Sequence, residues 1–441
     1  QAASPTSSAP TAPAKGGADV PAASAPATAG PAGATPAAAP AAAGRNVSLN
    51  LMWDGWIIDQ NPVVNDLVGR YSDETGVKVS ADKTPPDQDQ KILLEARQGK
   101  STWGGREGHS NTSTAPLVEG GALAAWDSYV TKDDLDDLYE TSKEEMKYKG
   151  KLYHFPLRVS PVLLGAWPRT LEKLGYKDIP TTWDETFEIA EKAAKTLSTP
   201  SERFFGYGFL ADPAYGLWAV MASLTRKPFD LDKGLANLDQ PAALEALRIM
   251  QRLYPVSPPE GLPDLTALTN TMLTGRMALV QVHVVRAGRA KDKFKDDFRI
   301  GRVPHGKDGE GTNYWSSGAT ILRNYGDATV QAEVAKFWLW LSKRRELFDS
   351  MWIKNGSPPN RRSLQKLYEP LKGKEIDPGY WELFKQQEVS QPKPASLVIG
   401  IQEKYAQQEV ANLMLGKSRS PEEAIAAIKK QTDDEVAKQQ R

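Results

Sequence analysis

The order of strand-forming and helix-forming segments is the feature that most constrains the fold of this chain. Apolar residues alternate with polar ones from Val47 to Trp53, which predicts a strand with one buried face. A helical stretch over 63–75 follows, stops at Gly76 and leads into a short apolar alternation over 77–79. Strand, helix and strand in this order predict an α/β lobe.

The same order restarts beyond Pro156. An apolar strand over 159–167 precedes a helix over 169–174, and a second helix runs from Thr182 to about residue 197. The Thr182 hydroxyl with Glu185 three residues later forms the capping-box pattern of a helix start. A chain of 441 residues also exceeds the roughly 250–300 residues over which one hydrophobic core grows. We therefore predict two α/β lobes. Further helices are predicted over 241–253, over 330–341 and after Ser420.

Composition separates the first 45 residues from the rest and excludes several classes of protein. Those residues are almost wholly Ala, Pro, Thr, Ser and Gly, a composition that predicts a disordered tether. The chain has 55 basic and 55 acidic residues and no cysteine. The charge balance argues against nucleic acid as a partner, and the lack of thiols excludes disulfides, thiolate metal sites and cysteine nucleophiles. No stretch approaches the roughly 18 apolar residues that span a bilayer.

Patterns that would indicate an enzyme or a metal site are weak. Asp184 and Glu185 are neighbours on one helix, so their side chains diverge by about 100° and cannot flank one glycosidic bond. The stretch 206–211 formally fits a dinucleotide motif, but Asp212-Pro213 follows where a helix should begin. The histidines at 109, 154, 283 and 305 are scattered. We therefore expect neither an enzyme nor a bound metal or cofactor.

Aromatic residues beside polar ones are the candidates for ligand binding. The chain has 12 Trp and 14 Tyr, and a pyranose stacks on an aromatic ring while its hydroxyl groups need polar partners. Trp53, Asp54 and Trp56 follow the first strand, at the end of the sheet where ligands bind in open α/β folds. Trp338 and Trp340, inside an apolar helix, are predicted to be core. The other candidates are His109 and Asn111 in a Gly-rich loop, Asn355 and Arg361 in a second loop region, and Tyr215, Trp218, Trp315 and Ser316.

Several segments, taken in order, resemble the extracytoplasmic solute-binding proteins of ABC importers, in the group that includes maltose-binding proteins. They are PLVEGGALAAWDSY at 116–129, KGKLYHFP at 149–156, GYKDIPTTWDE at 175–185, NTMLTGRMAL at 270–279, AKFWLWL at 335–341 and the closing stretch 420–428. The resemblance implies an α/β, two-lobed periplasmic-binding-protein fold of type II, with the ligand cleft between lobes joined by a hinge. It implies that lobe 1 comprises 46–157 with 318–370, and lobe 2 comprises 158–317 with 371–441.

The resemblance also implies a function. Such a protein binds a carbohydrate, expected here to be an oligosaccharide, by hinge closure and delivers it to the membrane permease. We expect an extracytoplasmic monomer. Lipoprotein members of the family carry a lipidated cysteine ahead of such a tether, and this chain has no cysteine. Either that cysteine precedes Gln1 and an N-terminal lipid anchor is the one membrane contact, or this member is free in its compartment. Many relatives read Tyr-Asn after the hinge strand. This chain reads Ala166-Trp167, so Trp167 either adds a stacking surface or fills the hinge.

Two alternatives stay open at this point. A different solute, such as a polyamine, a glycerophosphoryl compound or a quaternary ammonium osmolyte, fits the same class, because aromatic cages also bind quaternary ammonium groups. A secreted carbohydrate-active enzyme is the alternative from another class. Product formation on a labelled oligosaccharide would distinguish it from a binding protein.

Overall fold

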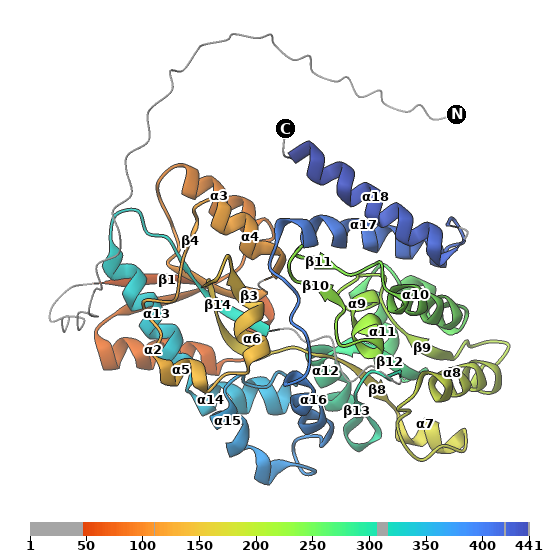
Figure 1. Cartoon of the computed structure of the whole chain (residues 1–441). Helices are drawn as coiled ribbons and strands as arrows, with labels where there is room; N and C mark the ends of the chain where they lie inside the picture. Colours follow the sequence, from red (N-terminus) through yellow and green to blue (C-terminus); the bar gives the residue numbers. More distant parts are fainter. Residues whose placement is uncertain (1–46, 110, 307–315, 419, 440–441) are drawn as a thin grey trace, which may run out of the picture. The chain divides into compact units, whose positions relative to one another are not determined.

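The computed structural model describes residues 47–439 except 110, 307–315 and 419. Residues 46–441 form one compact unit, and two β-sheets organise its described part (Figure 1). The first sheet has the order β2-β1-β3-β14-β4, with β7 also paired to β14, and the second has the order β13-β8-β12-β9. The strands of the first sheet are β1 (Ser48–Trp53), β2 (Lys78–Lys83), β3 (Gly105–His109), β4 (Leu123–Ala124), β7 (His154–Val159) and β14 (Ser316–Leu322).

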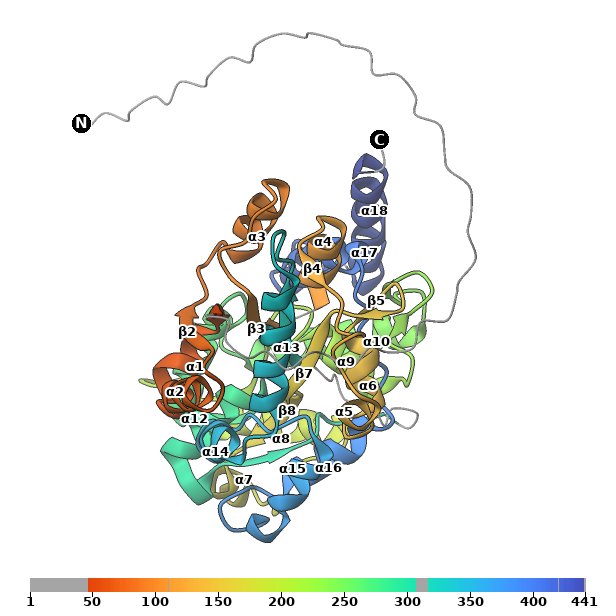
Figure 2. The ribbon, with the colours of Figure 1, turned by 90° about the vertical axis from the view of Figure 1, so that its left-hand side faces the viewer.

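The first sheet is covered by helices on both faces. Its β1 runs parallel to β2 and β3, whereas β14 runs antiparallel to β3, β4 and β7. Leu49 and Leu51 pack under α2 (Val63–Thr75) and α13 (Ala328–Ser342), and Figure 2 shows α13 lying across this face. Met52 points to the other face, toward α3 (Gln88–Arg97) and α4 (Asn111–Glu119). Successive side chains of β1 thus pack into two apolar layers, one on each face of the sheet.

The second sheet carries its own helices. Its strands are β8 (Val162–Ala166), β9 (Phe205–Gly208), β12 (Met277–His283) and β13 (Arg299–Gly301). Strands β9 and β12 run parallel, so their carboxyl ends lie at the same edge of the second sheet. The helix α12 (Val284–Phe294) follows β12 directly. The other helices of this half are α7 (Pro168–Lys173), α8 (Trp183–Leu197), α9 (Leu217–Leu224), α10 (Pro241–Leu253), α11 (Leu265–Leu273), α17 (Leu397–Met414) and α18 (Pro421–Gln439).

Short elements lie between these, and they include 3-10 helices at Tyr254–Val256, Pro259–Gly261, Lys295–Asp297 and Glu369–Leu371 and a π-helix at Asp349–Lys354, besides α-helices and hairpins. The α-helices among them are α1 (Gly55–Gln60), α5 (Lys132–Asp136), α6 (Glu140–Glu145), α14 (Arg345–Phe348), α15 (Arg362–Leu367) and α16 (Gly379–Gln387). Two small hairpins pair β5 (Lys147–Tyr148) with β6 (Lys151–Leu152) and β10 (Phe229–Asp230) with β11 (Leu235–Ala236). Within the described ranges, no helix has both the length and the apolar character to cross a membrane.

Three backbone segments meet where the chain passes between the sheets. The chain leaves the first sheet at Val159 and enters the second at Val162, and it returns to the first sheet at Ser316. Val159 N donates a hydrogen bond to Pro358 O at 3.0 Å, and Asn360 N donates to Leu157 O at 3.0 Å. The segments 157–162, 316–317 and 357–361 are named the crossing segments below.

Several local predictions are confirmed and some are corrected. The helix predicted over 241–253 is α10 and the one over 63–75 is α2. The strand predicted over 159–167 is interrupted between β7 and β8, because Pro161 has no N–H to continue a ladder. The helix α4 ends at Glu119, and Gly121 beyond it has a φ of 71°, the left-handed backbone that is common after a helix end.

The start of α8 departs from the predicted capping box by one residue. Thr182 Oγ1 accepts a hydrogen bond from Glu185 N at 3.3 Å, as predicted. The Glu185 carboxylate accepts instead from Thr181 N at 3.1 Å, one residue before the cap. Trp183 is buried in the second half and donates from Nε1 to Ser223 Oγ. The segment 181–185 therefore caps α8 and packs into the core of the second half.

The backbones of α12 and of the loop at Asn355 lie in direct contact. A Cβ placed on Gly288 would lie 2.4 Å from Asn355 O, closer than nonbonded atoms approach. We expect Gly288→Ala to displace α12 and to lower the free energy of unfolding by about 1–3 kcal/mol. Gly69→Ala in α2, where no atom lies within 4 Å of the added Cβ, is the matched control and should be neutral or stabilising. Urea denaturation measures both, and equal stability of the two variants would contradict the contact.

Candidate binding site

Arg158 is the centre of a polar cluster at the end of β7. Its Nε donates a hydrogen bond to Glu107 Oε1 at 2.9 Å, and its Nη2 lies 3.3 Å from Asp54 Oδ2. Its Nη1 donates to Ser160 Oγ at 3.1 Å. The side chains of Arg158 and Glu107 are 1% and 2% exposed. Each guanidinium nitrogen thus has a partner, which a buried cation needs to offset its loss of hydration.

Three strands of the first sheet bring this cluster together. Asp54 follows β1, Glu107 lies in β3 and Arg158 lies in β7. Because β14 runs antiparallel to both β3 and β7, all three strands run in the same direction. Their carboxyl ends therefore share one edge of the sheet, where ligands of α/β folds bind.

Trp56 completes the first-sheet side. The guanidinium carbon of Arg158 lies 5.0 Å from the centroid of the Trp56 ring, a distance at which a cation and an aromatic ring attract each other. Trp56 is only partly buried. The cluster therefore fixes the orientation of an indole that keeps accessible surface.

The second sheet supplies a pair of rings. Tyr215 follows β9, His283 ends β12, and their ring centroids are 5.2 Å apart with an interplanar angle of 35°. Gln281 anchors the Tyr215 loop, because its Nε2 donates to Tyr215 O at 2.6 Å while its Oε1 accepts from Tyr207 at 2.9 Å. The loop is thus tied to the strand beside it.

Electrostatics relate the two sides. Burial raises the pKa of the Tyr215 hydroxyl, the charges of Asp212 and Asp54 add to this, and those of Arg286 and Arg158 oppose it. The Tyr215 hydroxyl is therefore near enough to charged groups of both halves to interact with them. Asp54, Trp56, Glu107, Arg158, Tyr215 and His283 are together named the junction site.

Glu107 is the titratable group of the junction site whose pKa is shifted toward neutrality. Burial raises the pKa of its carboxyl to about 7, the charge of Arg158 opposes this rise and the charge of Asp54 adds to it. Its Oε2 is buried without a hydrogen-bond partner among the described groups. A proton on this oxygen would remove a buried charge, so Glu107 should exchange a proton near neutral pH.

Trp53, predicted to contact ligand, lies in the core. It is 1% exposed, and its ring centroid is 4.9 Å from that of Trp338 in α13. Trp53 shares a face of β1 with Leu49 and Leu51, and α13 covers that face. Trp53 is therefore corrected from the site to the core, because its ring offers no accessible surface.

Trp167 and Trp218 are core residues for the same reason. The Trp167 ring meets Phe294 and Phe298 edge to face, with centroids 5.7 Å and 5.1 Å away. Trp218 is fully buried and donates from Nε1 to Glu403 Oε1 at 3.2 Å. Of the two interpretations of Trp167, the structure favours filling of the hinge region over a stacking surface.

Arg361 joins helices of the first half. It is 3% exposed, and its guanidinium donates to Ser342 Oγ at 2.9 Å, Asp134 Oδ1 at 2.9 Å and Asp137 Oδ2 at 3.2 Å. All of its donor groups face protein partners. We therefore assign Arg361 to the support of the fold and not to the site.

Ser316 and Asn355 also stabilise backbone segments. Ser316 N donates to Glu145 Oε2 at 2.8 Å, and its hydroxyl accepts from Asn360 Nδ2 at 3.1 Å. Asn355 Nδ2 donates to Asn61 Oδ1 at 2.9 Å. Ser316 lies opposite Val159 in the β14–β7 pairing and acts on the crossing segments, and Asn355 acts on the loop beside α12.

Three predicted residues are not placed by side chain. Trp315 lies outside the described residues, and so do the side chains of His109 and Asn111. The backbone puts His109 at the end of β3 and Asn111 at the start of α4, two and four residues beyond Glu107. These residues stay predictions, while Asp54, Trp56 and Tyr215 are brought together.

The sequence prediction did not include Glu107, Arg158 or His283 as site residues. One signal was present, because Arg158 is the only charged residue in the apolar run from Phe155 to Trp167. A lone charge in a buried strand needs partners. Glu107 gave no such signal, since it lies in a Gly-rich stretch that reads as a loop.

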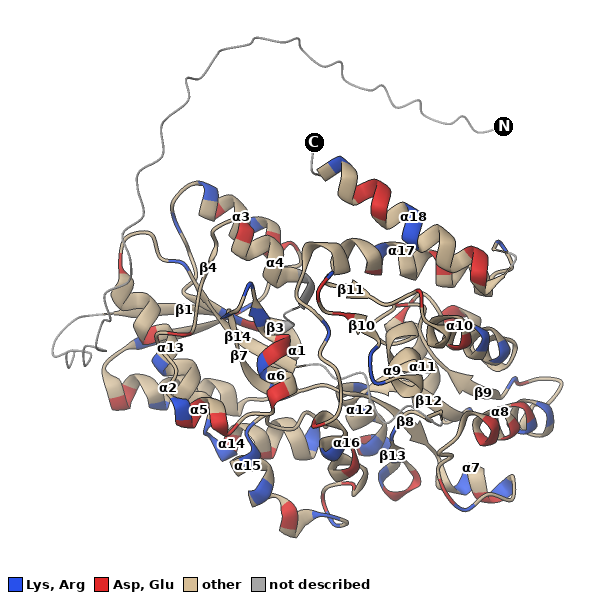
Figure 3. Cartoon of the chain, viewed as in Figure 1, with Lys and Arg blue, Asp and Glu red and all other residues tan. Residues whose placement is uncertain are grey.

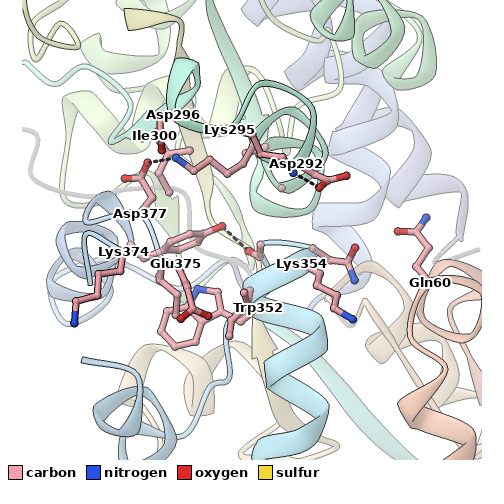
Figure 4. A pocket seen from close by; sticks show the side chains of 18 residues that line it. Gln60, Asp292, Lys295, Asp296, Ile300, Trp352, Lys354, Lys374, Glu375 and Asp377 are labelled. Carbon is pink, nitrogen blue, oxygen red and sulfur yellow. Dashed lines mark hydrogen bonds and ion pairs between the residues drawn. The ribbon is translucent and has the colours of Figure 1, made fainter. Parts of the chain in front are cut away.

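A separate cavity of about 460 Å³ lies between α12 and the loop that contains Asn355. Figure 4 shows charged side chains around it, among them Lys295, Lys354 and Asp377. Its aromatic residues, Trp352 and Tyr380, are 1% and 7% exposed and are enclosed by other rings, with Tyr368 4.7 Å from Trp352 and Phe384 6.5 Å from Tyr380. This enclosure leaves no ring face for a sugar, so the junction site is the better candidate. Within the described ranges, no group of three or more His, Asp and Glu could hold a metal ion.

Trp53 and Trp56 should differ in their effect on stability. We expect Trp53→Ala to lower the free energy of unfolding by roughly 3–5 kcal/mol, because it leaves a cavity against α13. Trp56→Ala removes a partly exposed ring and should cost only about 1 kcal/mol. Chemical denaturation followed by circular dichroism measures both, and a larger loss for Trp56→Ala would overturn the assignment.

Glu107 should make stability depend on pH. Its pKa in the folded state, about 7, exceeds its ordinary value of 4.5, so the folded state binds the proton more tightly. The contribution of Glu107 is therefore fully present below about pH 4.5 and lost as pH rises toward 7, with a slope of at most about 1.4 kcal/mol per pH unit. Glu107→Gln should remove this slope between pH 5 and 7 in paired unfolding curves. Parallel curves for the two proteins would refute the proton assignment.

A curated protein is similar to this chain in sequence. The chain is 24% identical over 247 residues to the maltotriose-binding protein of Pyrococcus abyssi, covering 55% of this chain and 51% of that protein. The chain thus spans about half the length of this curated relative.

Two solved structures are similar in fold. A solute-binding protein of an ABC transporter from Thermotoga lettingae, bound with α-D-tagatose, has a TM-score of 0.74 at 17% identity and covers 88% of this chain and 99% of its own. The maltotriose-binding protein of Thermus thermophilus has a TM-score of 0.70 at 19% identity, with coverage of 88% and 100%. These likenesses show the two-lobed periplasmic-binding-protein fold.

The sequence model of one family matches over residues 66–370, more than half of the chain. That family is described as bacterial extracellular solute-binding proteins. The chain therefore belongs to the bacterial extracellular solute-binding protein family.

Proposed function

We propose that this chain is the extracytoplasmic substrate-binding component of an ABC importer and that it binds a carbohydrate, an oligosaccharide, by hinge closure. The observation that carries the proposal is the junction site. Trp56 lies just after β1 of the first sheet, and the paired rings of Tyr215 and His283 lie beyond β9 and at the end of β12 of the second sheet. Rings on two sides suit the apolar faces of a pyranose, and Asp54 supplies an acceptor for its hydroxyl groups. His109, Asn111 and Trp315 are proposed as further contacts, because they are predicted near the same edge.

Hinge closure follows from where the junction site lies. Arg158 and Ser160 belong to a crossing segment, so the site is next to the backbone about which two lobes would rotate. A ligand that touches both sheets favours the closed arrangement by the difference between its affinities for the closed and open forms. We propose lobe 1 as 46–157 with 318–370 and lobe 2 as 158–317 with 371–441.

The relatives support a sugar by analogy. The Pyrococcus abyssi relative is named for maltotriose, and the two structures above are bound with tagatose and maltotriose. We propose that this chain, as a monomer, delivers its ligand to a membrane permease and catalyses no reaction on it. A lipid anchor would hold it at the cell surface or in the periplasm.

A panel of sugars tests the function. Maltotriose, maltose and short oligosaccharides of other linkages are titrated, with intrinsic Trp emission and melting temperature as the readouts. At least one sugar should change the emission and raise the melting temperature by several degrees, because a ligand that binds only the folded state stabilises it. Trp56→Ala should raise the dissociation constant for that sugar at least about tenfold, measured by the shift in melting temperature. A panel that changes neither readout would refute the carbohydrate assignment.

The enzyme alternative has its own readout. Incubation with the same sugars, labelled at one end, should return them unchanged. A labelled product formed in proportion to protein concentration would favour a carbohydrate-active enzyme instead.

A further inference from the structure

Two arginines in the first two turns of α12 lack an anionic partner in the described part of the chain. Arg286 Nε is buried and has no hydrogen-bond partner there. Neither Arg286 nor Arg289 forms an ion pair with a described carboxylate. Elsewhere, basic and acidic residues are interspersed on the helices (Figure 3), and buried Arg158 and Arg361 each have carboxylate partners.

Arg286 lies on the second-sheet side of the junction site. The helix α12 begins directly after His283, whose ring packs on Tyr215, so Arg286 is in the first turn beyond that pair of rings. Its charge acts on the Tyr215 hydroxyl, as the charge of Arg158 does from the first sheet. Arg286 is therefore positioned to reach a ligand held between the two sides.

An unpaired, partly buried guanidinium has an energetic cost. Burial lowers the pKa of Arg286, and the like charge of Arg289 lowers it further. The nearest carboxylates of the first sheet, Asp54 and Glu107, already pair with Arg158. An anion supplied from outside the chain would offset this cost, and the planar guanidinium suits the two oxygens of a carboxylate or phosphate.

We propose that the ligand of the junction site is a carbohydrate with an anionic substituent, held by Arg286 with support from the charge of Arg289. This inference rests on the proposed function and adds the charge class of the ligand. A neutral sugar would leave both cations without an anionic partner among the described residues and the ligand. The inference also disfavours the cationic alternatives, polyamines and quaternary ammonium compounds, because a second cation beside Arg286 would be repelled.

Matched probes test the charge class. The affinities of trigalacturonate, maltotriose and glucose 6-phosphate are measured by calorimetry in low salt and again in about 0.5 M NaCl, with inorganic phosphate as a control. At least one anionic sugar should bind at least about tenfold more tightly than maltotriose, and high salt should reduce that advantage. Tighter binding of trigalacturonate identifies a carboxylate as the group, and tighter binding of glucose 6-phosphate identifies a phosphate.

Variants separate charge from fold. Arg286→Gln should weaken the anionic sugar by about 10–100-fold while changing maltotriose binding little. Arg286→Lys keeps the charge without the fork and should retain part of the affinity. Arg169→Gln on α7, whose side chain is 80% exposed, is the matched control and should change nothing. Circular dichroism confirms that each variant is folded.

The outcomes distinguish this inference from the function beneath it. If maltotriose binds as tightly as both anionic sugars, or if Arg286→Gln leaves their affinities equal to the wild type, the charge inference is overturned while the carbohydrate function stands. If no sugar of either class binds, both fail. Tighter binding of inorganic phosphate than of any sugar would also overturn the inference, since it would mean that the carbohydrate is not recognised.

Discussion

The structure of the junction site depends on Arg158. Its backbone belongs to the crossing segment that pairs with Pro359, and its side chain reaches Asp54, Glu107 and the Trp56 ring. Burial of a guanidinium that is 1% exposed costs hydration free energy, which the three hydrogen bonds of Arg158 offset. The need to satisfy this one buried cation therefore fixes the ends of β1, β3 and β7 relative to each other and to the crossing segments.

This arrangement would couple the proposed ligand binding to the proposed hinge closure. The groups that would touch a ligand from the first sheet are held by Arg158, whose backbone lies in a crossing segment, the proposed hinge. The groups from the second sheet, Tyr215 and His283, are held by Gln281 and by their own ring contact. A ligand between them adds contacts that neither sheet can make alone, so its free energy of binding acts directly on the arrangement of the two lobes.

Local features of the fold were predictable from the sequence, whereas most of the site was not. The end of α2 is marked by Gly76 and the start of α10 by Pro241. Both signals are local, because capping residues act within one turn of the helix end. The alternation in β1 already placed Trp53 on the same face as Leu49 and Leu51, which α13 covers. The sequence nevertheless predicts that Trp53 contacts ligand, because the covering helix α13 begins only at Ala328 and its packing against β1 is not visible in the local sequence. Arg158 shows the same limit, since its partners lie on strands that are adjacent only after folding.

The location of bound ligand tests the account most directly. A crystal structure with the tightest-binding oligosaccharide should show a sugar ring against Trp56 and contacts from Tyr215 or His283 on the other side. The Arg158 hydrogen bonds to Asp54 and Glu107 should be preserved in that complex. Ligand bound instead in the cavity beside Trp352, or on one sheet without contact to the other, would contradict the central claim.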